Sequence, residues 1–216
     1  MKKKSLSAKK AIHKNLLNYL KNPIIGRIYR DFENLLLSDN KVKSLAIAVS
    51  GGPDSLALTY LAKCFSILNN LKVNYYHLDH KLRKTSTKEA IKLKSVLKKF
   101  DIDCKILVWK GKKPNSNIQS VARKKRYFLI INQISKDKFN HLLIAHHLDD
   151  LYENFLIRLL RGSGLKGLAS FNQVNTGYNN KVKILRPLIN VNKKDLVFLA
   201  IKIFNFYIKD PSNENV

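Results

Sequence analysis

Short apolar runs alternate with helix-like stretches along most of this chain, and that alternation limits the folds it can adopt. The runs that predict strands cover residues 45–49, 73–80, 104–109, 141–147 and 183–189. Apolar residues at helical spacing predict helices over residues 54–69, 87–99, 117–134, 149–160 and 192–205, the last behind a cap at Asn192. Such alternation is typical of βαβ units, whose strands lie parallel and are covered by helices. We therefore expect an α/β fold, a Rossmann-like parallel sheet in a three-layer αβα domain.

Two more helices are expected ahead of the first strand. They cover residues 8–20 and 27–37, and the first should end before Pro23, because the residue before a proline disfavours helical geometry. This divides the chain into an N-terminal helical segment, residues 1–40, and an α/β domain, residues 41–216. Residues 172–183 are rich in Asn and predict a loop or a short hairpin.

The charge balance indicates the kind of partner. Lys and Arg number 41 against 15 Asp and Glu, a net charge of +26, which favours a polyanionic partner such as nucleic acid. Compositional drift in an A/T-rich genome would also enrich Lys, Asn and Ile, but it does not explain the scarcity of acids. Cys64 and Cys104 form no CxxC motif and are expected as free buried thiols. Without a membrane-length apolar run or a secretory signal, we expect no membrane partner and a cytoplasmic location.

The motif SGGPDS, residues 50–55, stands between the first predicted strand of the α/β unit and the helix that follows. Backbone N–H groups at such a junction can bind phosphate, and Gly51 and Gly52 let the backbone approach it closely. Ser50 and Ser55 add hydroxyl groups. Asp54 beside phosphate implies Mg²⁺ between the two charges. The alternative is a tight turn in which Asp54 caps the helix.

Two further polar clusters follow predicted strands. HLDHKLR, residues 77–83, suits a loop that contacts a nucleotide base or ribose, and a solvated polar turn is the alternative. In AHHLDDLYEN, residues 145–154, Asp150 and Glu153 share one helix face and can bind Mg²⁺, another cation or an ammonium group. Acidic residues are also favoured in a first helical turn by the helix dipole alone. Ligands of such folds bind beyond the carboxyl ends of the strands, where all three clusters lie.

With ARKKRYFLI (122–130), RPL (186–188) and DPSN (210–213), these motifs stand in an order that resembles the N-type ATP pyrophosphatases, the PP-loop superfamily, and within it the tRNA(Ile)-lysidine synthetases. The resemblance implies an adenine nucleotide alpha hydrolase-like fold and an ATP-dependent carbon–nitrogen ligase. ATP adenylates the C2 oxygen of the wobble cytidine in tRNA(Ile) with a CAU anticodon. The ε-amine of free L-lysine then attacks C2 and expels AMP. The product, lysidine, changes codon recognition from AUG to AUA.

The resemblance also implies residue roles. The residues expected to bind ATP are Ser50, Gly51, Gly52, Pro53, Asp54, Ser55, Leu78, Asp79 and Arg83, with Asp54 holding Mg²⁺. Asp150 and Glu153 are expected to hold lysine, with Arg186 near its carboxylate. His146 is the candidate base, because the attacking amine must be neutral. Arg123 or Arg126 stabilises charge on the phosphate, and the sequence leaves that choice open.

The chain departs from the family pattern in two places. Asn154 stands where the family usually has Thr, and the sequence given ends soon after DPSN, so we expect C-terminal tRNA-binding domains to be absent. A tRNA thiolase is one alternative, although Cys64 and Cys104 are poorly placed for it. A catalytically silent RNA-binding remnant is another, and the intact Asp54 and His146 argue against it. The sequence does not indicate an oligomeric state.

Overall fold

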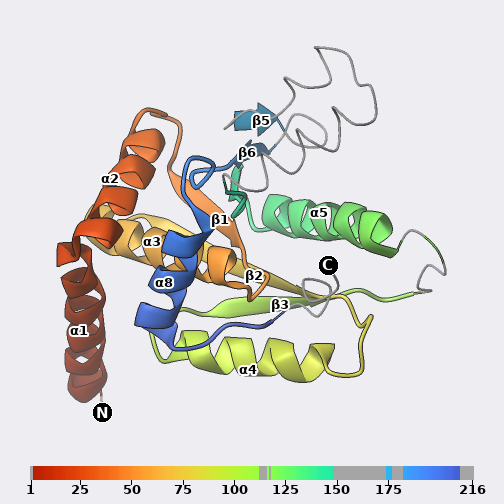
Figure 1. Ribbon diagram of the computed structural model, residues 1–216, viewed down its shortest axis with the longest axis horizontal. Coiled ribbons are helices and arrows are strands. Elements are labelled where there is room, and N and C mark those ends of the chain that lie inside the picture. The colour runs from red at the N-terminus through yellow and green to blue at the C-terminus, as the bar shows by residue number, and fades with distance from the viewer. Residues whose placement is uncertain (1, 112–115, 117, 148–173, 177–181, 210–216) are drawn as a thin grey trace.

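A computed structural model describes residues 2–111, 116, 118–147, 174–176 and 182–209 of the chain (Figure 1). In this part the strands form one sheet in the order β3-β2-β1-β4-β6-β5. Their bounds are β1 Ser44–Ala48, β2 Lys72–Asp79, β3 Cys104–Val108, β4 His141–Leu143, β5 Val174–Thr176 and β6 Lys183–Leu185. Neighbouring strands are parallel except for β5, which lies antiparallel to β6 at the edge. The predicted α/β fold with a parallel sheet is confirmed.

Two strands are shorter than the apolar runs that predict them. β4 ends at Leu143, although the Ile144 N–H still donates to Leu185 O at 3.1 Å. β6 ends at Leu185, because residues 187–190 form turns and Pro187 has no N–H to donate to a ladder. Both early endings leave polar residues, His146 and Arg186, just beyond the strand ends.

The described helices agree with the predicted ones to within a few residues at most ends. Their bounds are α1 Lys2–Asn18, η1 Tyr19–Lys21 (a 3₁₀ turn), α2 Pro23–Leu37, α3 Pro53–Asn69, α4 Ser86–Lys98, α5 Ile118–Lys136 and α8 Lys193–Phe204. α2 begins earlier than expected because the Asn22 side chain accepts the N–H groups of Ile24 and Ile25. Asn192 occupies the cap position of α8 but makes no side-chain cap bond. The helix expected over residues 149–160 lies outside the described residues.

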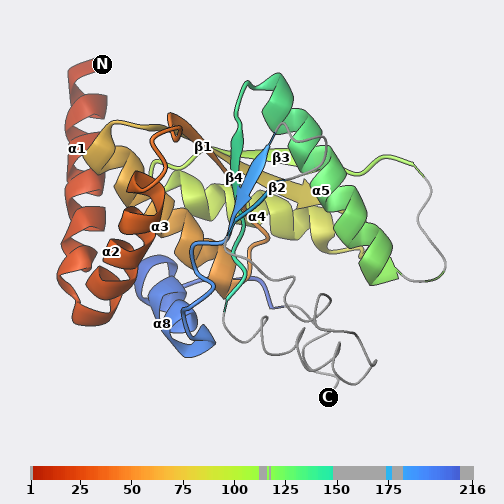
Figure 2. The same ribbon diagram turned by 90° about the horizontal axis from the view of Figure 1, so that it is seen from above.

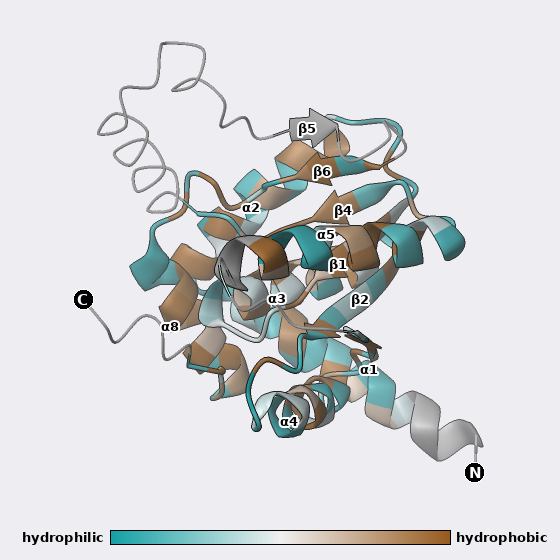
Figure 3. Cartoon of the chain, turned by 90° about the vertical axis from the view of Figure 1, so that its right-hand side faces the viewer, coloured by the Kyte–Doolittle hydropathy of each residue, from teal (hydrophilic) through white to brown (hydrophobic). Residues whose placement is uncertain are grey.

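The sheet separates two hydrophobic cores (Figure 2). Leu45 and Ile47 of β1 pack into the larger core with α2, α3, α4 and α8. Ala46, which points the other way, packs against α5, including Ile130 and Ile134. Figure 3 shows hydrophobic residues in brown on the strands β4 and β6 and on the helix α8. Three layers with the sheet in the middle are therefore present in the described part of the chain.

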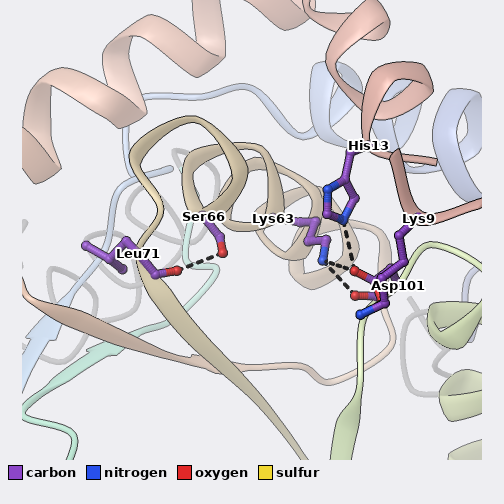
Figure 4. A network of polar contacts seen from close by, with 6 residues as sticks. All are labelled: Lys9, His13, Lys63, Ser66, Leu71 and Asp101. Atoms are coloured by element: carbon purple, nitrogen blue, oxygen red, sulfur yellow. Dashed lines mark hydrogen bonds and ion pairs between the residues drawn. The ribbon is translucent and has the colours of Figure 1, made fainter. Parts of the chain in front are cut away.

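The N-terminal helices share the larger core. Phe32 of α2 meets Phe65 of α3 edge-on with ring centroids 6.0 Å apart. The Tyr60 hydroxyl donates to Leu16 O at 3.0 Å, which connects α3 to α1. Side chains of α1 and α3, among them Lys63, also converge on Asp101 (Figure 4). Both α1 and α2 are thus anchored to α3.

The sheet order also locates the expected ligand crevice. From β1 the chain proceeds to β2 and β3 on one side, whereas β4 lies on the other side of β1. Ligands of open α/β sheets bind at such a switch point, outside the carboxyl ends of the strands. No helix in the described ranges is long and apolar enough to cross a membrane.

Candidate active site

The loop after β1 is held in shape by its own Ser55. The Ser55 hydroxyl donates to Gly52 O at 2.9 Å and accepts the Gly51 N–H at 3.0 Å, and Ser50 Oγ lies 3.0 Å from it. Ser55 is only 4% exposed, so its hydroxyl shapes the loop from within. α3 starts at Pro53 with Gly52 at its cap position and Asp54 in its first turn, so the prediction that Asp54 caps the helix, made as part of the alternative, is wrong.

Gly51 has a conformation that other residues rarely adopt. Its φ is +94°, and a Cβ there would lie 2.5 Å from Cδ1 of Ile208. The Ile208 N–H also donates to Gly51 O at 2.9 Å. The segment after α8 therefore lies directly against the loop, a contact that the sequence interpretation did not include.

A pocket of about 700 Å³ opens at the carboxyl edge of the sheet, a size that suits a small-molecule ligand. Its walls come from the ends of β1, β2 and β4 and from α5. Among the residues predicted for the site, those that line it are Ser50, Gly52, Asp54, Ser55, Leu78, Asp79, Arg83, Arg126 and His146. Gly51 and Pro53 lie in the same loop. Asp150 and Glu153 lie outside the described residues.

Asp79 organises the loop after β2. It is 2% exposed, and its carboxylate accepts hydrogen bonds from the Lys81 N–H at 2.9 Å, Ser86 Oγ at 2.8 Å and Thr87 Oγ1 at 2.6 Å. Burial alone raises the pKa of Asp79, but these hydrogen bonds outweigh it and lower the pKa below its ordinary value. The ionised Asp79 carboxylate thus fixes the loop that reaches Arg83.

The neighbouring His77 connects this loop to the first one. Its Nδ1 lies 2.8 Å from the carbonyl oxygen of Val49, the residue directly before the SGGPDS loop. Burial lowers the pKa of His77 below its ordinary value, so the neutral ring donates this hydrogen bond. The ends of β1 and β2 are therefore fixed to each other by a side chain as well as by strand pairing.

His146 lies between two arginines. The Arg186 Nε–H donates to His146 Nδ1 at 3.2 Å, and Arg123 Nη2 lies 3.4 Å from His146 Nε2. Burial lowers the pKa of Arg186, and the neighbouring Arg123 lowers it further. The structure thus brings three predicted residues from β4, β6 and α5 together. Both ring nitrogens of His146 face guanidinium groups, so accepting a proton from a substrate requires one of these contacts to open.

Arg126 belongs to a different part of the pocket. Its Nε–H donates to His80 Nε2 at 3.3 Å. His80 in turn lies edge-on to Trp109, with ring centroids 6.1 Å apart. One helical turn of α5 therefore directs Arg123 toward the end of β4 and Arg126 toward the end of β2.

The sequence interpretation missed one residue beside Asp54. His147 Nε2 lies 3.6 Å from Asp54 Oδ2, and His147 is 4% exposed. The doubled histidine of AHH, at a strand end, was the available signal. No group of three or more metal-binding side chains occurs in the described ranges. A single carboxylate beside a phosphate loop still suits Mg²⁺, which proteins often hold through one carboxylate together with substrate phosphates.

The two cysteines are structural. Cys64 and Cys104 are free and buried, as predicted. Burial raises the pKa of each thiol to about 12. Neither lines the pocket, so neither has the accessible thiolate that sulfur transfer or cluster binding needs.

Comparison with protein families identifies the family of the chain. The model of the PP-loop domain family matches residues 25–216. The chain belongs to this family. The PP-loop family uses ATP, and both the SGGPDS loop and the pocket around it lie within the matched residues.

Curated relatives of this PP-loop domain are named tRNA(Ile)-lysidine synthase. The protein from Orientia tsutsugamushi is 43% identical over 171 residues, which is 79% of this chain and 38% of that protein. The protein from Rickettsia akari is 35% identical over 191 residues, which is 87% of this chain and 44% of that protein. The chain thus spans about two fifths of the length of these relatives.

Solved structures confirm the fold of the PP-loop domain. A U34-tRNA thiolase from Methanococcus maripaludis, with its [4Fe-4S] cluster, has a TM-score of 0.69 at 21% identity, covering 88% of this chain and 68% of that one. An FMN adenylyltransferase from Candida glabrata in complex with ATP has a TM-score of 0.53 at 13% identity, covering 90% and 63%. At these identities the likeness concerns the fold alone.

Proposed function

We propose that this PP-loop domain is the catalytic part of a tRNA(Ile)-lysidine synthetase. The observation that carries the proposal is that one pocket is lined both by the SGGPDS loop and by His146, which contacts Arg123 and Arg186. The first can bind the pyrophosphate part of ATP, and the second supplies charge at the reacting atoms. The names of the relatives add the substrate class, a tRNA.

In the first step, ATP adenylates the C2 oxygen of the wobble cytidine and pyrophosphate leaves. The N–H groups at the start of α3 bind the phosphates, and Asp54 would hold Mg²⁺, which would supply positive charge to the phosphates. The loop fixed by Asp79, with Leu78 and Arg83, contacts the nucleoside of ATP. Ser50, Gly51, Gly52, Pro53 and Ser55 complete the ATP site.

In the second step, the ε-amine of free L-lysine forms a bond to C2, and the C2–O bond to AMP breaks. Asp150 and Glu153 bind the lysine, and Arg186 lies near its carboxylate. The attacking amine must release a proton, because its ordinary pKa is about 10.4. His146 is the candidate acceptor once its contact with Arg123 or Arg186 opens. Arg123 or Arg126 stabilises negative charge on the phosphate.

The tRNA partner carries a CAU anticodon in this proposal, and lysidine formation changes its codon from AUG to AUA. The net charge of +26 favours such a polyanion. Residues 41–216 form the catalytic domain behind a helical segment, residues 1–40, and the reaction takes place in the cytoplasm. A thiolase is not favoured, because both thiols are buried away from the pocket.

The test measures labelled lysine incorporated into a tRNA(Ile) transcript in the presence of ATP and Mg²⁺. We expect incorporation by the chain as given and a loss of at least about 100-fold in Asp54→Asn and Asp150→Asn. Asp103→Asn is the matched control, because that side chain is 93% exposed and far from the pocket. Binding of the transcript without any incorporation would instead identify an RNA-binding remnant.

A further inference from the structure

Helix α5 carries a cluster of basic residues in its first half. Residues Ile118–Lys136 include Arg123, Lys124, Lys125, Arg126 and Lys136 and no acidic residue. Like charges three or four positions apart, such as Arg123 and Arg126, destabilise a helix when nothing neutralises them. The next acidic residue, Asp137, follows the last residue of the helix, and its Oδ2 accepts a hydrogen bond from the Tyr76 hydroxyl at 2.8 Å. It therefore cannot neutralise the basic residues in the first half of the helix. The arrangement favours a polyanion as the neutralising partner.

The side of α5 that faces away from the sheet also carries an aromatic ring. Ala122, Ile130 and Ile134 are buried, and Phe128, on the opposite side of the helix, is 50% exposed. Lys125 Nζ lies 5.3 Å from the centroid of the Phe128 ring. Lys124, one turn before Phe128, is exposed as well. The exposed Lys124 and the partly buried Lys125 thus lie on the same face of the helix as a flat, exposed aromatic ring.

This outer face adjoins the candidate active site. Arg126 and Tyr127 of the same helix line the pocket, and Arg123 contacts His146. Figure 2 shows α5 running along one side of the sheet. A polynucleotide whose reacting base enters the pocket must pass over a neighbouring surface, and α5 supplies both charge and an aromatic ring there.

We propose that the outer face of α5, defined by Lys124, Lys125 and Phe128, binds the single-stranded RNA next to the base being modified. Phe128 stacks on an unpaired base, while Lys124 and Lys125 contact phosphates. This combination of stacking and backbone charge is the usual way in which proteins hold single strands. The inference rests on the proposed function for the identity of the RNA, and it extends that function to a surface outside the pocket.

Other occupants fit this face less well. Phe128 and Val121 are exposed apolar side chains of this helix, but they and the neighbouring lysines offer too little apolar area for a protein interface, whose centre is depleted of Lys. It also lacks the broad apolar face with which a helix enters a lipid surface. A paired RNA helix offers no free base for the ring to stack on.

The first test compares binding of two RNA probes by fluorescence anisotropy. One is a hairpin with an unpaired loop that contains CAU, and the other is a fully paired duplex of equal length. We expect Phe128→Ala to weaken hairpin binding about tenfold, Phe128→Tyr to retain it, and neither to change duplex binding. Phe198→Ala on α8 is the control, because Phe198 is another partly exposed phenylalanine (37%) that does not line the pocket. Equal loss for both probes, or no loss, would overturn the inference.

The second test concerns the lysines. In Lys124→Gln/Lys125→Gln, the slope of log K against log salt concentration for the hairpin should become shallower by about 1.4, since each phosphate contact with a single strand contributes about 0.7. The control pair is Lys98→Gln/Lys99→Gln, two exposed lysines at the end of α4. The same change of slope in both double variants would mean that the effect of a lysine on RNA binding does not depend on its position, and would contradict the inference.

These measurements distinguish the inference from the proposed function, because they need neither ATP nor lysine. If the chain incorporates no lysine but Phe128→Ala still loses hairpin binding selectively, the proposed function fails and the RNA surface stands. If lysine is incorporated and Phe128→Ala binds the hairpin normally, the surface fails and the proposed function stands. Unchanged melting temperatures of the variants would show that the fold is intact.

Discussion

His147 Nε2 lies 3.6 Å from Asp54 Oδ2 across the switch point of the sheet. Asp54 comes from the first turn of α3, after β1, and His147 follows β4. The imidazole is 4% exposed, so the surrounding side chains limit its rotation. We infer that His147 restricts the orientation of the carboxylate that would hold Mg²⁺.

His147→Gln should therefore weaken the use of ATP without abolishing it. We expect kcat/KM for ATP to fall about tenfold, equivalent to about 1.4 kcal/mol, and the Mg²⁺ concentration for half-maximal activity to rise. Steady-state kinetics at several Mg²⁺ concentrations measure both. In an Asp54→Asn background the same substitution should add little, because residues that act as a unit are not additive. Additive losses would contradict the inferred coupling.

The two arginines of α5 should have separable effects. Arg123 contacts His146 and Arg126 contacts His80, which follow β4 and β2 respectively. We expect Arg123→Gln to lower kcat, because its guanidinium lies beside the proposed reacting atoms, by about 100-fold. Arg126→Gln should mainly raise KM for ATP. Initial rates at varied ATP concentration distinguish the two, and the reverse pattern would exchange the assigned roles.

A third prediction concerns stability at acid pH. Lys63 Nζ lies 2.9 Å from Asp101 Oδ2, His13 Nε2 lies 2.9 Å from the same oxygen, and Lys9 Nζ lies 3.1 Å from Oδ1 (Figure 4). Burial alone raises the pKa of Asp101, but these contacts outweigh it and hold the pKa well below its ordinary value. A carboxyl group whose pKa is lowered by folding stabilises the fold above its unfolded pKa, about 3.9, and loses that contribution as the pH falls.

We expect Asp101→Asn to cost about 2 kcal/mol of unfolding free energy near pH 7, because it leaves the Lys63 ammonium without its carboxylate. The difference from the parent should shrink as the pH falls below about 4, because the unfolded parent then binds a proton at Asp101 while the folded parent keeps this carboxylate ionised. Asn tolerates the positive φ of 56° at this position. Urea denaturation over this pH range, with Asp103→Asn as control, measures the effect. A difference that does not depend on pH would show that the charge is not responsible.

The sequence was sufficient to predict the layered fold and the edge where the site lies. Apolar runs bounded by polar residues marked the strands, and the carboxyl ends of parallel strands meet at one edge. His146 and Asp79 could therefore be placed in one pocket although they lie far apart in the chain. The length of β4 could not be predicted, because Ile144 remains buried and apolar after the strand has ended.

Individual contacts were less accessible from the sequence. His147 approaches Asp54, and Ile208 approaches Gly51, because segments distant in the sequence pack together. The periodicity of the sequence does not indicate such contacts. Ser55 illustrates a different difficulty. Its hydroxyl can turn toward a ligand or toward its own loop, and only coordinates show that it bonds to Gly52 O.

The last prediction uses the two glycines of the loop as a matched pair. At Gly51, a φ of +94° and a Cβ position 2.5 Å from Ile208 Cδ1 both oppose a side chain. At Gly52, φ is −70° and the nearest atom to a Cβ is Ser50 Oγ at 3.7 Å. The folded protein thus requires glycine at the first position only.

We expect Gly51→Ala to cost about 2 kcal/mol of unfolding free energy from backbone strain and the close contact with Ile208, a fall of about 4–8 °C in Tm. Adding Ile208→Ala should restore part of the lost unfolding free energy, because it removes the close contact but not the backbone strain.

Gly52→Ala should have the same Tm as the parent but bind ATP about tenfold more weakly, because a methyl group would separate the backbone from the phosphates. Thermal melting and calorimetric ATP titration test both. Parent-like ATP affinity in Gly52→Ala would mean that the phosphates do not approach the loop at that residue.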